Sequence, residues 1–407
     1  MDGFHTVGQP AAVAAVHAML ATHVPHAVLL VGPASVGKHQ LALDLAAGLL
    51  CTGATGGDRP CRACRGCRMV EHGNHPDLHR LGPTGAGGQV VIGGKEGKRG
   101  VRELVNDLAL LPVEGGERIA IVREAHRMNE DAQSAFLKTL EEPPAATTLV
   151  LLVDDEEQLL PTIRSRCARI RLGTVGPRDI ERLLSERDLA DPPTAARLAR
   201  LAGGRPGVAV AYATSPDAER IRGEISRTLI DLLGRRRSER LGSAKGLMGS
   251  AMELARLLEP ADEAPETARR PKGRGRGAPV ALATTPAEAA EAGAGGEPPA
   301  DVPDPAEDAP GPKASAADRR RALGLLLEIW RDLARDLAYA GHGAARSMRE
   351  TAMLEELEAA ARTLPPDATR AALARLVRAG ELLEANATPE LVLDVLLIRW
   401  PVAGRAA

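Results

Sequence analysis

The sequence predicts an α/β domain with a parallel sheet, followed by helical regions. From Val7 to about Leu172, short apolar runs alternate with amphipathic stretches, which is typical of a parallel sheet covered by helices on both faces. A glycine-rich loop with the spacing of a phosphate loop follows the first apolar run. Beyond Leu172, helical segments that begin with proline replace the apolar runs.

The strands of this sheet are expected at the apolar runs 27–31, 77–81, 118–123, 147–153 and 167–172. One of the helices between them is marked by apolar residues at helical spacing, which are expected to line one face and pack on the core: Val101, Leu104, Val105, Leu108 and Leu111.

Composition divides the rest of the chain. A small helical unit is predicted over 173–214, with helices at Pro177–Ser185, Pro193–Leu201 and Pro206–Ala213. A second all-helical domain is predicted from 215–260 together with 317–401, where apolar residues such as Leu323, Leu326, Leu327 and Trp330 share one helix face.

Residues 261–316 are rich in Pro, Ala, Gly and Glu and contain few large apolar side chains. Such a segment buries too little surface to offset the entropy of ordering, so a disordered linker is expected. Its basic cluster, 269–276, could contact DNA or an acidic partner, but a solvated run of charge is the favoured interpretation.

The phosphate loop is Gly32-Pro33-Ala34-Ser35-Val36-Gly37-Lys38-His39, after the strand 27–31. In a working loop the backbone amides and the lysine hold phosphates, and a Ser or Thr hydroxyl binds Mg²⁺. Gly32, Gly37 and Lys38 keep the phosphate-binding pattern, but His39 stands in place of the hydroxyl. Imidazole is a poor ligand for Mg²⁺, which prefers oxygen.

The acidic strand that should complete the metal site is 118–123. Arg123 occupies the position of the expected aspartate, and Glu124 is retained. Because both metal-side groups are missing, we expect no ATP hydrolysis by this chain alone, whereas ATP binding is left open.

Cys51, Cys61, Cys64 and Cys67 have the spacing C-x₉-C-x₂-C-x₂-C. Four thiolates satisfy tetrahedral Zn²⁺ and leave no open position, so a structural zinc module over 51–67 is predicted. An iron–sulfur cluster is the alternative, although the C-x₃-C-P continuation is absent. Arg59, Arg62, Arg65 and Arg68 interleave with the ligands and are expected as solvated side chains.

Composition narrows the functional classes. Aromatic residues make up 1% of the chain and the formal net charge is −2, which argues against base stacking and against a globally basic nucleic-acid binder. The N-terminus has no basic start before an apolar core, and no run is long enough to cross a bilayer, so a cytoplasmic protein with protein partners is expected.

Two arginines, Arg166 before the last strand and Arg205 in a Gly-Gly-Arg-Pro-Gly turn, could act at a distance from their own backbone. Arg166 could stabilise a phosphoryl group bound by a neighbouring subunit. From the residues alone, a surface salt bridge is the stronger interpretation for both.

Several motifs together resemble bacterial clamp-loader subunits of DNA polymerase III, specifically the delta-prime family within the AAA+ class. The resemblance is carried by Val7-Gly8-Gln9, His26-Ala27, the 32–38 loop, the four cysteines, the stretch from Ser134 to Pro144 and Ser165-Arg166-Cys167. It covers roughly residues 7–210. It is weaker at the end of the chain, where it depends on Asn386-Ala387-Thr388-Pro389-Glu390-Leu391.

The resemblance implies an AAA+ domain, a helical lid and a C-terminal collar that assembles five subunits into an open ring. It implies loading of the sliding clamp onto primer-template DNA with gamma or tau and delta subunits, as part of the DNA-directed DNA polymerase III holoenzyme. Intrinsic catalysis is not expected. His39 and Arg123 point to delta-prime rather than to the motor subunits, and Arg166 would be the arginine finger for a neighbour's ATP. Val153-Asp154 would lie where a motor has a polar sensor residue.

Two other functions remain open. The chain could be a gamma- or tau-like ATPase that binds ATP despite its substitutions. It could also be a module whose zinc site and basic linker contact DNA directly, with an affinity that falls steeply with salt.

Overall fold

The structure is a computed structural model that describes residues 3–83, 89–93, 100–114, 116–258, 315–365 and 367–403. The linker expected over 261–316, with its basic cluster, lies outside the described residues except for Ser315 and Ala316.

A parallel sheet of five strands forms the centre of the N-terminal domain, with the order β2-β3-β4-β1-β5. The sheet and the type of the domain are as predicted, and the strand bounds differ from the expected runs by at most one residue at either end. The strands are β1 (Ala27–Val31), β2 (Leu78–Leu81), β3 (Arg118–Val122), β4 (Thr147–Val153) and β5 (Ala168–Arg171). Every residue of β1, β3 and β4 is buried, which explains why these strands read as continuous apolar runs.

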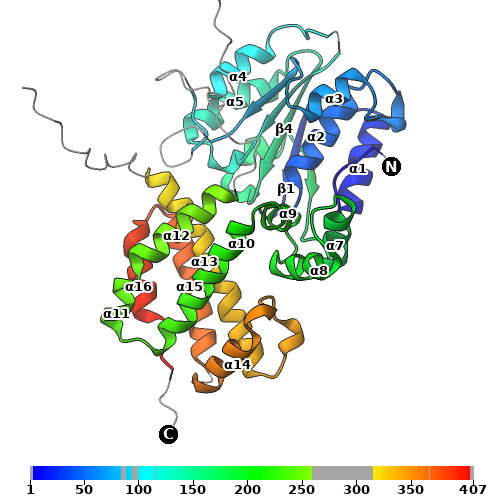
Figure 1. Cartoon of the computed structure of the whole chain (residues 1–407). Helices are drawn as coiled ribbons and strands as arrows, with labels where there is room; N and C mark the ends of the chain where they lie inside the picture. The colour runs from blue at the N-terminus through cyan, green and yellow to red at the C-terminus, as the bar shows by residue number, and fades with distance from the viewer. Residues whose placement is uncertain are drawn as a thin grey trace, which may run out of the picture. The chain divides into compact units, whose positions relative to one another are not determined.

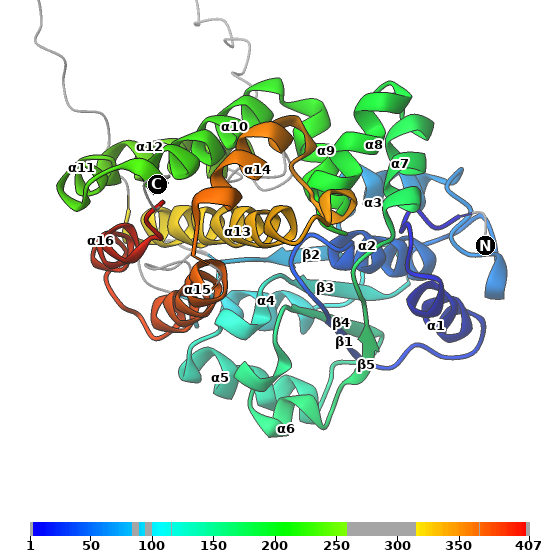
Figure 2. The same ribbon diagram turned by 90° about the horizontal axis from the view of Figure 1, so that it is seen from below.

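Helices cover both faces of this sheet (Figures 1 and 2). On one face, α1 (Pro10–Ala21), α2 (Lys38–Leu49) and α3 (Arg65–Glu71) pack against residues such as Val28 and Ile119. On the other, α4 (Val101–Leu108) and α5 (Glu130–Glu141) pack against residues such as Leu29 and Ala120. The two faces alternate along each strand, as the period of a β-strand requires.

The expected apolar face of α4 is only partly correct. Val101, Leu104 and Leu108 are fully buried, whereas Leu111 lies beyond the end of the helix with 87% of its surface exposed. The turn after the helix is held by Arg118 of β3, which is itself buried and donates to the carbonyl oxygens of Asp107 and Leu111. A contact from the following strand therefore holds the turn in which the helix ends, before the apolar periodicity ends.

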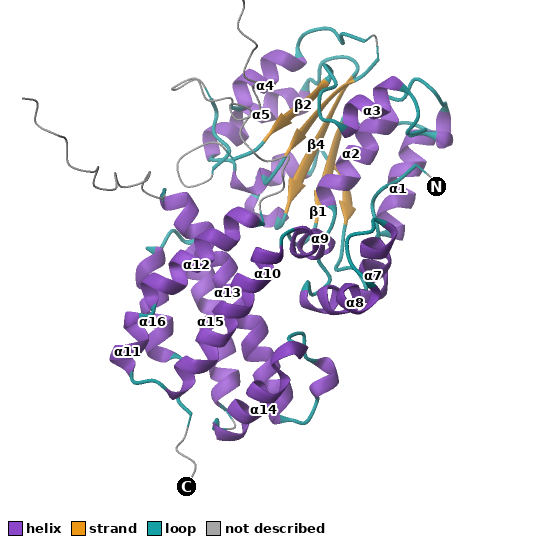
Figure 3. Ribbon diagram, in the orientation of Figure 1, coloured by secondary structure: helices purple, strands orange, loops and turns teal. Residues whose placement is uncertain are grey.

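The remaining described elements are helical (Figure 3). After β5 come α7 (Pro177–Glu186), α8 (Pro192–Leu201) and α9 (Pro206–Thr214), each with proline in its first turn. They are followed by α10 (Pro216–Asp231), α11 (Arg237–Gly242), α12 (Ala244–Leu257), α13 (Ala316–Gly341), α14 (Leu354–Thr363), α15 (Ala368–Glu384) and α16 (Pro389–Arg399). Short 3₁₀ turns join several of these elements.

Helices on both sides of the undescribed stretch share one hydrophobic core. Leu229 of α10 and Leu247 of α12 belong to the same buried cluster as Trp330 of α13 and Leu397 of α16. Trp400 packs edge-on against Trp330, with 5.1 Å between ring centroids, and donates its indole N–H to the carbonyl oxygen of Leu229 at 2.9 Å.

A buried ionic cluster adds to this core. Arg222 of α10 is 4% exposed; it pairs with Glu350 and lies 3.8 Å from the carboxylate of Asp332. Arg349 also pairs with Asp332. Desolvated charges need such partners, because an isolated buried charge is strongly destabilising.

Candidate phosphate loop and metal centre

The phosphate loop connects the end of β1 to the start of α2, as the strand–loop–helix pattern predicts. Gly32 donates its amide to the carbonyl oxygen of Val153 at 3.2 Å, and a Cβ placed on it would lie 2.3 Å from the carbonyl oxygen of Leu172. Gly37 has φ 106°, a left-handed backbone that favours glycine. Both glycines of the motif are therefore required by the path of the chain.

Lys38 is 8% exposed and its ammonium group is bound within the chain. Nζ donates to the carbonyl oxygens of Gly32 at 2.5 Å and Pro33 at 2.7 Å, and to Oδ1 of Asp154 at 2.7 Å. Asp154 directly follows β4, the neighbour of β1 in the sheet. Since a lysine has three donors, these acceptors satisfy the whole group.

The positions expected to bind Mg²⁺ carry the substituted residues. His39 is the second residue of α2, and Arg123 follows β3, where its guanidinium lies against Gly82: a Cβ there would be 2.9 Å from Nη2. Glu124 has a left-handed backbone, φ 48°, and pairs with Arg127 at 2.8 Å. A magnesium ion would therefore find neither the hydroxyl nor the aspartate of a working phosphate loop.

His126 borders the same region. Its Nδ1 accepts the amide of Asp154 at 3.3 Å, and burial lowers the pKa of His126 below its usual value. A neutral imidazole is thus placed next to the residue that pairs with Lys38.

Arg166 lies between α6 (Pro161–Arg164) and β5, with its side chain 35% exposed. Its guanidinium donates to Glu141 at 2.7 Å and to the carbonyl oxygen of Thr162 at 3.0 Å. β5 is the edge strand of the sheet and runs parallel to β1. Arg166 precedes β5 and the phosphate loop follows β1, so the two lie at opposite ends of these strands.

Arg205 has a different environment from that of a solvated surface residue. Its side chain is 20% exposed and pairs with Glu328 of α13. It thus joins the turn before α9 to the helices after the undescribed stretch, within a single compact unit.

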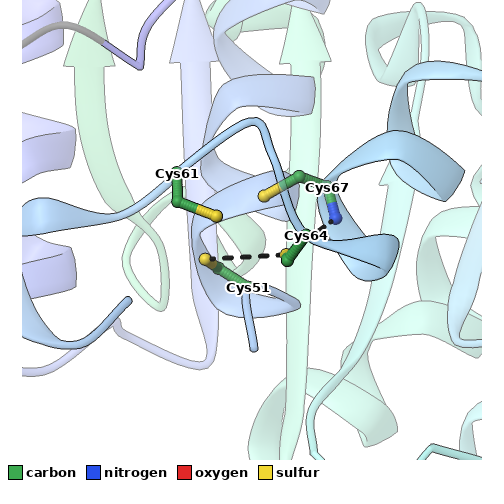
Figure 4. A group of neighbouring side chains, drawn as sticks. All are labelled: Cys51, Cys61, Cys64 and Cys67. Atoms are coloured by element: carbon green, nitrogen blue, oxygen red, sulfur yellow. Dashed lines mark hydrogen bonds between the residues drawn. The ribbon is translucent and has the colours of Figure 1, made fainter. Parts of the chain in front are cut away.

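The four cysteines converge on one point (Figure 4). Cys51 follows α2, Cys61 lies in the loop, Cys64 caps α3 and Cys67 lies within α3. Their sulfur atoms all lie within 4.8 Å of one another, and those of Cys51 and Cys64 are 3.9 Å apart. Sulfurs about 2.3 Å from a tetrahedral Zn²⁺ would be about 3.8 Å from each other, so the group fits a metal ion of this kind.

The backbone of the cysteine loop favours thiolates at two of these positions. Burial alone would raise the pKa of Cys64, but the amides of Cys67 and Thr52 outweigh it and lower the pKa to about 5. The amides of Cys64 and Ala63 lower the pKa of Cys61. Burial and the neighbouring Cys64 raise the pKa of Cys67. Because metals bind the deprotonated thiol, the lowered pKa values favour the ligand form at Cys61 and Cys64, whereas the raised pKa of Cys67 opposes it.

Two of the four interleaved arginines depart from the expectation of solvated side chains. Arg59 is half-buried and donates its Nε–H to the carbonyl oxygen of Ala54 at 3.1 Å. The side chain of Arg62 is 14% exposed and pairs with Asp44 of α2, a fully buried residue. Arg65 and Arg68 are exposed as expected. The sequence gives no local signal for the Arg62 contact, since Asp44 lies in a different element.

Comparison with known proteins adds the family context. Residues 8–175 match the family model described as "DNA polymerase III, delta subunit". DNA polymerase III subunit delta' of Pseudomonas aeruginosa is 36% identical over 188 residues, covering 44% of this chain and 53% of that protein. The Bacillus subtilis subunit delta' is 32% identical over 173 residues, covering 42% and 49%. The chain thus spans about half the length of these delta' relatives.

DNA polymerase III subunit tau of Escherichia coli is also similar, with 32% identity over 187 residues, covering 44% of this chain and 27% of that protein. Identity alone therefore does not separate the delta' and tau relatives. Among the helices that the structure describes, none combines the length and apolar character needed to cross a bilayer.

Proposed function

We propose that the whole chain is a clamp-loader subunit that does not hydrolyse ATP. The premise is that residues 8–175 belong to the delta-prime family of DNA polymerase III clamp-loader subunits. The observation that carries this proposal is the state of the phosphate loop. Lys38 is bound to Asp154 and to its own loop, and His39 and Arg123 replace the groups that would hold Mg²⁺. A nucleotide would lack the metal that neutralises charge on the transferred phosphoryl group.

The second part of the proposal assigns Arg166 to a neighbouring subunit. Arg166 and the chain's own phosphate loop lie at opposite ends of the neighbouring strands β5 and β1. The shorter strand, β5, has four residues, so the length of a strand separates the two by about 13 Å at 3.3 Å per residue. An arginine this far from its own loop is available to act in trans, on ATP bound by a gamma or tau subunit. It would stabilise the negative charge of the transition state there.

In this assignment, residues 1–172 form the AAA+ domain, 173–214 the lid, and 215–260 with 317–401 the collar. The partners are gamma or tau, delta and the sliding clamp, with primer-template DNA reached through the assembled complex in the cytoplasm. The cysteine cluster holds a structural Zn²⁺, since it supplies four sulfur ligands at a suitable spacing.

The test is an ATPase assay on the isolated chain and on the complex reconstituted with gamma or tau, delta, clamp and primed DNA. We expect no turnover by the isolated chain and stimulated turnover by the full mixture. Arg166→Ala should lower turnover of the complex by about 10³-fold for the site it serves. The control Arg169→Ala, another partly exposed arginine whose partner is Glu156, should leave turnover unchanged.

Turnover by the isolated chain would instead favour the alternative, a gamma- or tau-like motor. The similarity to a tau subunit is the observation that supports this alternative. Unchanged turnover with Arg166→Ala would refute the finger. Metal analysis tests the cofactor separately: about one zinc per chain is expected for four ligands, and a Cys64→Ser variant that retains full zinc would refute the site.

A further inference from the structure

Arg62 lies within the cysteine loop, between Cys61 and Cys64, and its side chain leaves that loop. Its guanidinium pairs with Asp44 of α2 and with Glu71 of α3, the latter at 3.2 Å. Its Nε donates to the carbonyl oxygen of Gly3 at 2.6 Å. One side chain of the metal module therefore contacts two helices and the start of the described chain.

Asp44 is the centre of these contacts and is 0% exposed. Besides Arg62, its carboxylate accepts the backbone amides of His5 at 3.2 Å and Thr6 at 2.9 Å, the Thr6 hydroxyl at 2.6 Å and the Gln40 amide at 3.1 Å. A buried carboxylate is stable only when its charge is paired and its oxygens are hydrogen-bonded. Arg62 provides that charge, and residues 5 and 6 depend on the same carboxylate.

Residues 3–9, which we call the N-terminal segment, continue from this point to the phosphate loop. Gln9 is 7% exposed; its Nε2 donates to the carbonyl oxygens of Val36 at 3.3 Å and Gly173 at 2.6 Å, and its Oε1 accepts the amide of Gly173 at 3.2 Å. The N-terminal segment thus contacts the cysteine loop at Gly3, α2 at Asp44 and the phosphate loop at Val36.

The backbone of the cysteine loop determines where Arg62 can reach. Arg62 has φ 55°, a left-handed conformation that is unfavourable for a residue with a side chain. Gly3 packs so closely on this loop that a Cβ placed on it would lie 1.9 Å from the carbonyl oxygen of Pro60. Bonds from Cys61 and Cys64 to one metal ion would hold both sides of Arg62 in this arrangement.

We propose that Arg62 is a positioning residue that fastens the N-terminal segment to α2, and that metal binding by the four cysteines is thereby coupled to the order of this segment beside the phosphate loop. The inference rests on the metal site proposed above. It gives the metal module a role in the AAA+ domain that extends beyond stabilising its own loop.

Hydrogen exchange measured by mass spectrometry on the full chain tests the coupling, with metal content determined on the same samples. In the metal-loaded protein, Arg62→Ala should retain its metal, while the amides of His5 and Thr6 exchange at least about tenfold faster because Asp44 loses its cation. Arg62→Lys should recover part of the protection. The matched control is Arg65→Ala, which removes a side chain 73% exposed on the same module and should change neither amide.

Chelation of the metal supplies the second perturbation. It should accelerate exchange of His5 and Thr6 in the wild-type protein, but add little at these amides in Arg62→Ala, because contacts in one network are not additive. Exchange over residues 61–71 should rise in both proteins.

Two results would overturn the proposal: unchanged exchange of His5 and Thr6 in Arg62→Ala, or full protection of these amides after chelation of the wild type. A failure of the metal site itself would appear separately, as purified protein without bound metal. If Arg62→Ala does not fold, Arg62→Lys takes its place. The coupling predicts that chelation accelerates exchange of His5 and Thr6 less in Arg62→Lys than in the wild type. An equal acceleration would overturn the coupling.

Discussion

Replacing Asp154 by asparagine tests whether the ion pair between Lys38 and Asp154 weakens nucleotide binding. The carboxylate lies 2.7 Å from Nζ, and its side chain is 42% exposed, whereas that of Lys38 is 9% exposed. Two unit charges at this distance attract each other by about 1.5 kcal/mol at the dielectric constant of water and by about 6 kcal/mol at an effective value of 20. Because Asp154 is partly solvated, the lower figure is the better guide.

Each 1.4 kcal/mol changes an equilibrium constant about tenfold, so Asp154→Asn should tighten nucleotide binding by about tenfold. The variant also removes a negative charge that would repel phosphate. Titration of the isolated chain with a non-hydrolysable ATP analogue, followed by calorimetry, measures this change. Asp155→Asn is the matched control, since Asp155 is the next carboxylate along the chain but caps the turn at Glu157 and does not contact Lys38.

Equal affinity of the wild type and Asp154→Asn would refute the idea that this ion pair competes with phosphate. An equal gain in nucleotide affinity in Asp155→Asn would show that the effect comes from removing a negative charge near the loop and not from breaking the ion pair with Lys38. Turnover of ATP by Asp154→Asn would contradict a different step, the argument that His39 and Arg123 deprive the site of magnesium.

Three further predictions concern stability. Arg222→Ala should cost about 3–5 kcal/mol, because Glu350 and Asp332 would keep buried charge without this partner; chemical denaturation measures the loss, and exposed Arg220→Ala should leave the midpoint almost unchanged. Since burial lowers the pKa of His126 in the folded chain, its contribution to stability should be present above the unfolded pKa of about 6.5 and decline as pH falls below it. Unfolding followed from pH 8 to pH 5 should show this decline, and it should be smaller in His126→Asn; an equal decline would contradict the assignment. Trp400→Phe should cost about 1–2 kcal/mol, because the carbonyl oxygen of Leu229 loses its buried donor, and an unchanged midpoint would contradict the importance of that bond.

The sequence was sufficient to predict the sheet because its central strands are buried on both faces and therefore appear as continuous apolar runs. The cysteine cluster was predictable for a related reason: its ligands lie close together in the sequence, and their spacing matches a tetrahedral site. Local patterns of this kind carry their own structural information.

Contacts between distant segments were less predictable. The pair of Lys38 with Asp154 joins residues 116 positions apart, and the pair of Arg62 with Asp44 joins residues 18 positions apart in different elements. Leu111 continues the helical periodicity of α4, yet Arg118 of the next strand binds the turn that exposes it. In each case a buried charged side chain makes the contact. The hydrophobic periodicity of the sequence does not predict the partner of such a side chain.

The contact between α12 and α13 has a consequence for the length of chain that connects them. The end of α12 and the start of α13 pack into the same buried cluster, to which Leu254 of α12 and Ala322 of α13 both belong. The chain therefore leaves the shared core and returns to it at neighbouring points. For a connection between such points, each doubling of the number of residues costs only about 0.6 kcal/mol in loop-closure entropy. The packing of α12 against α13 therefore sets no fixed length for the residues between them.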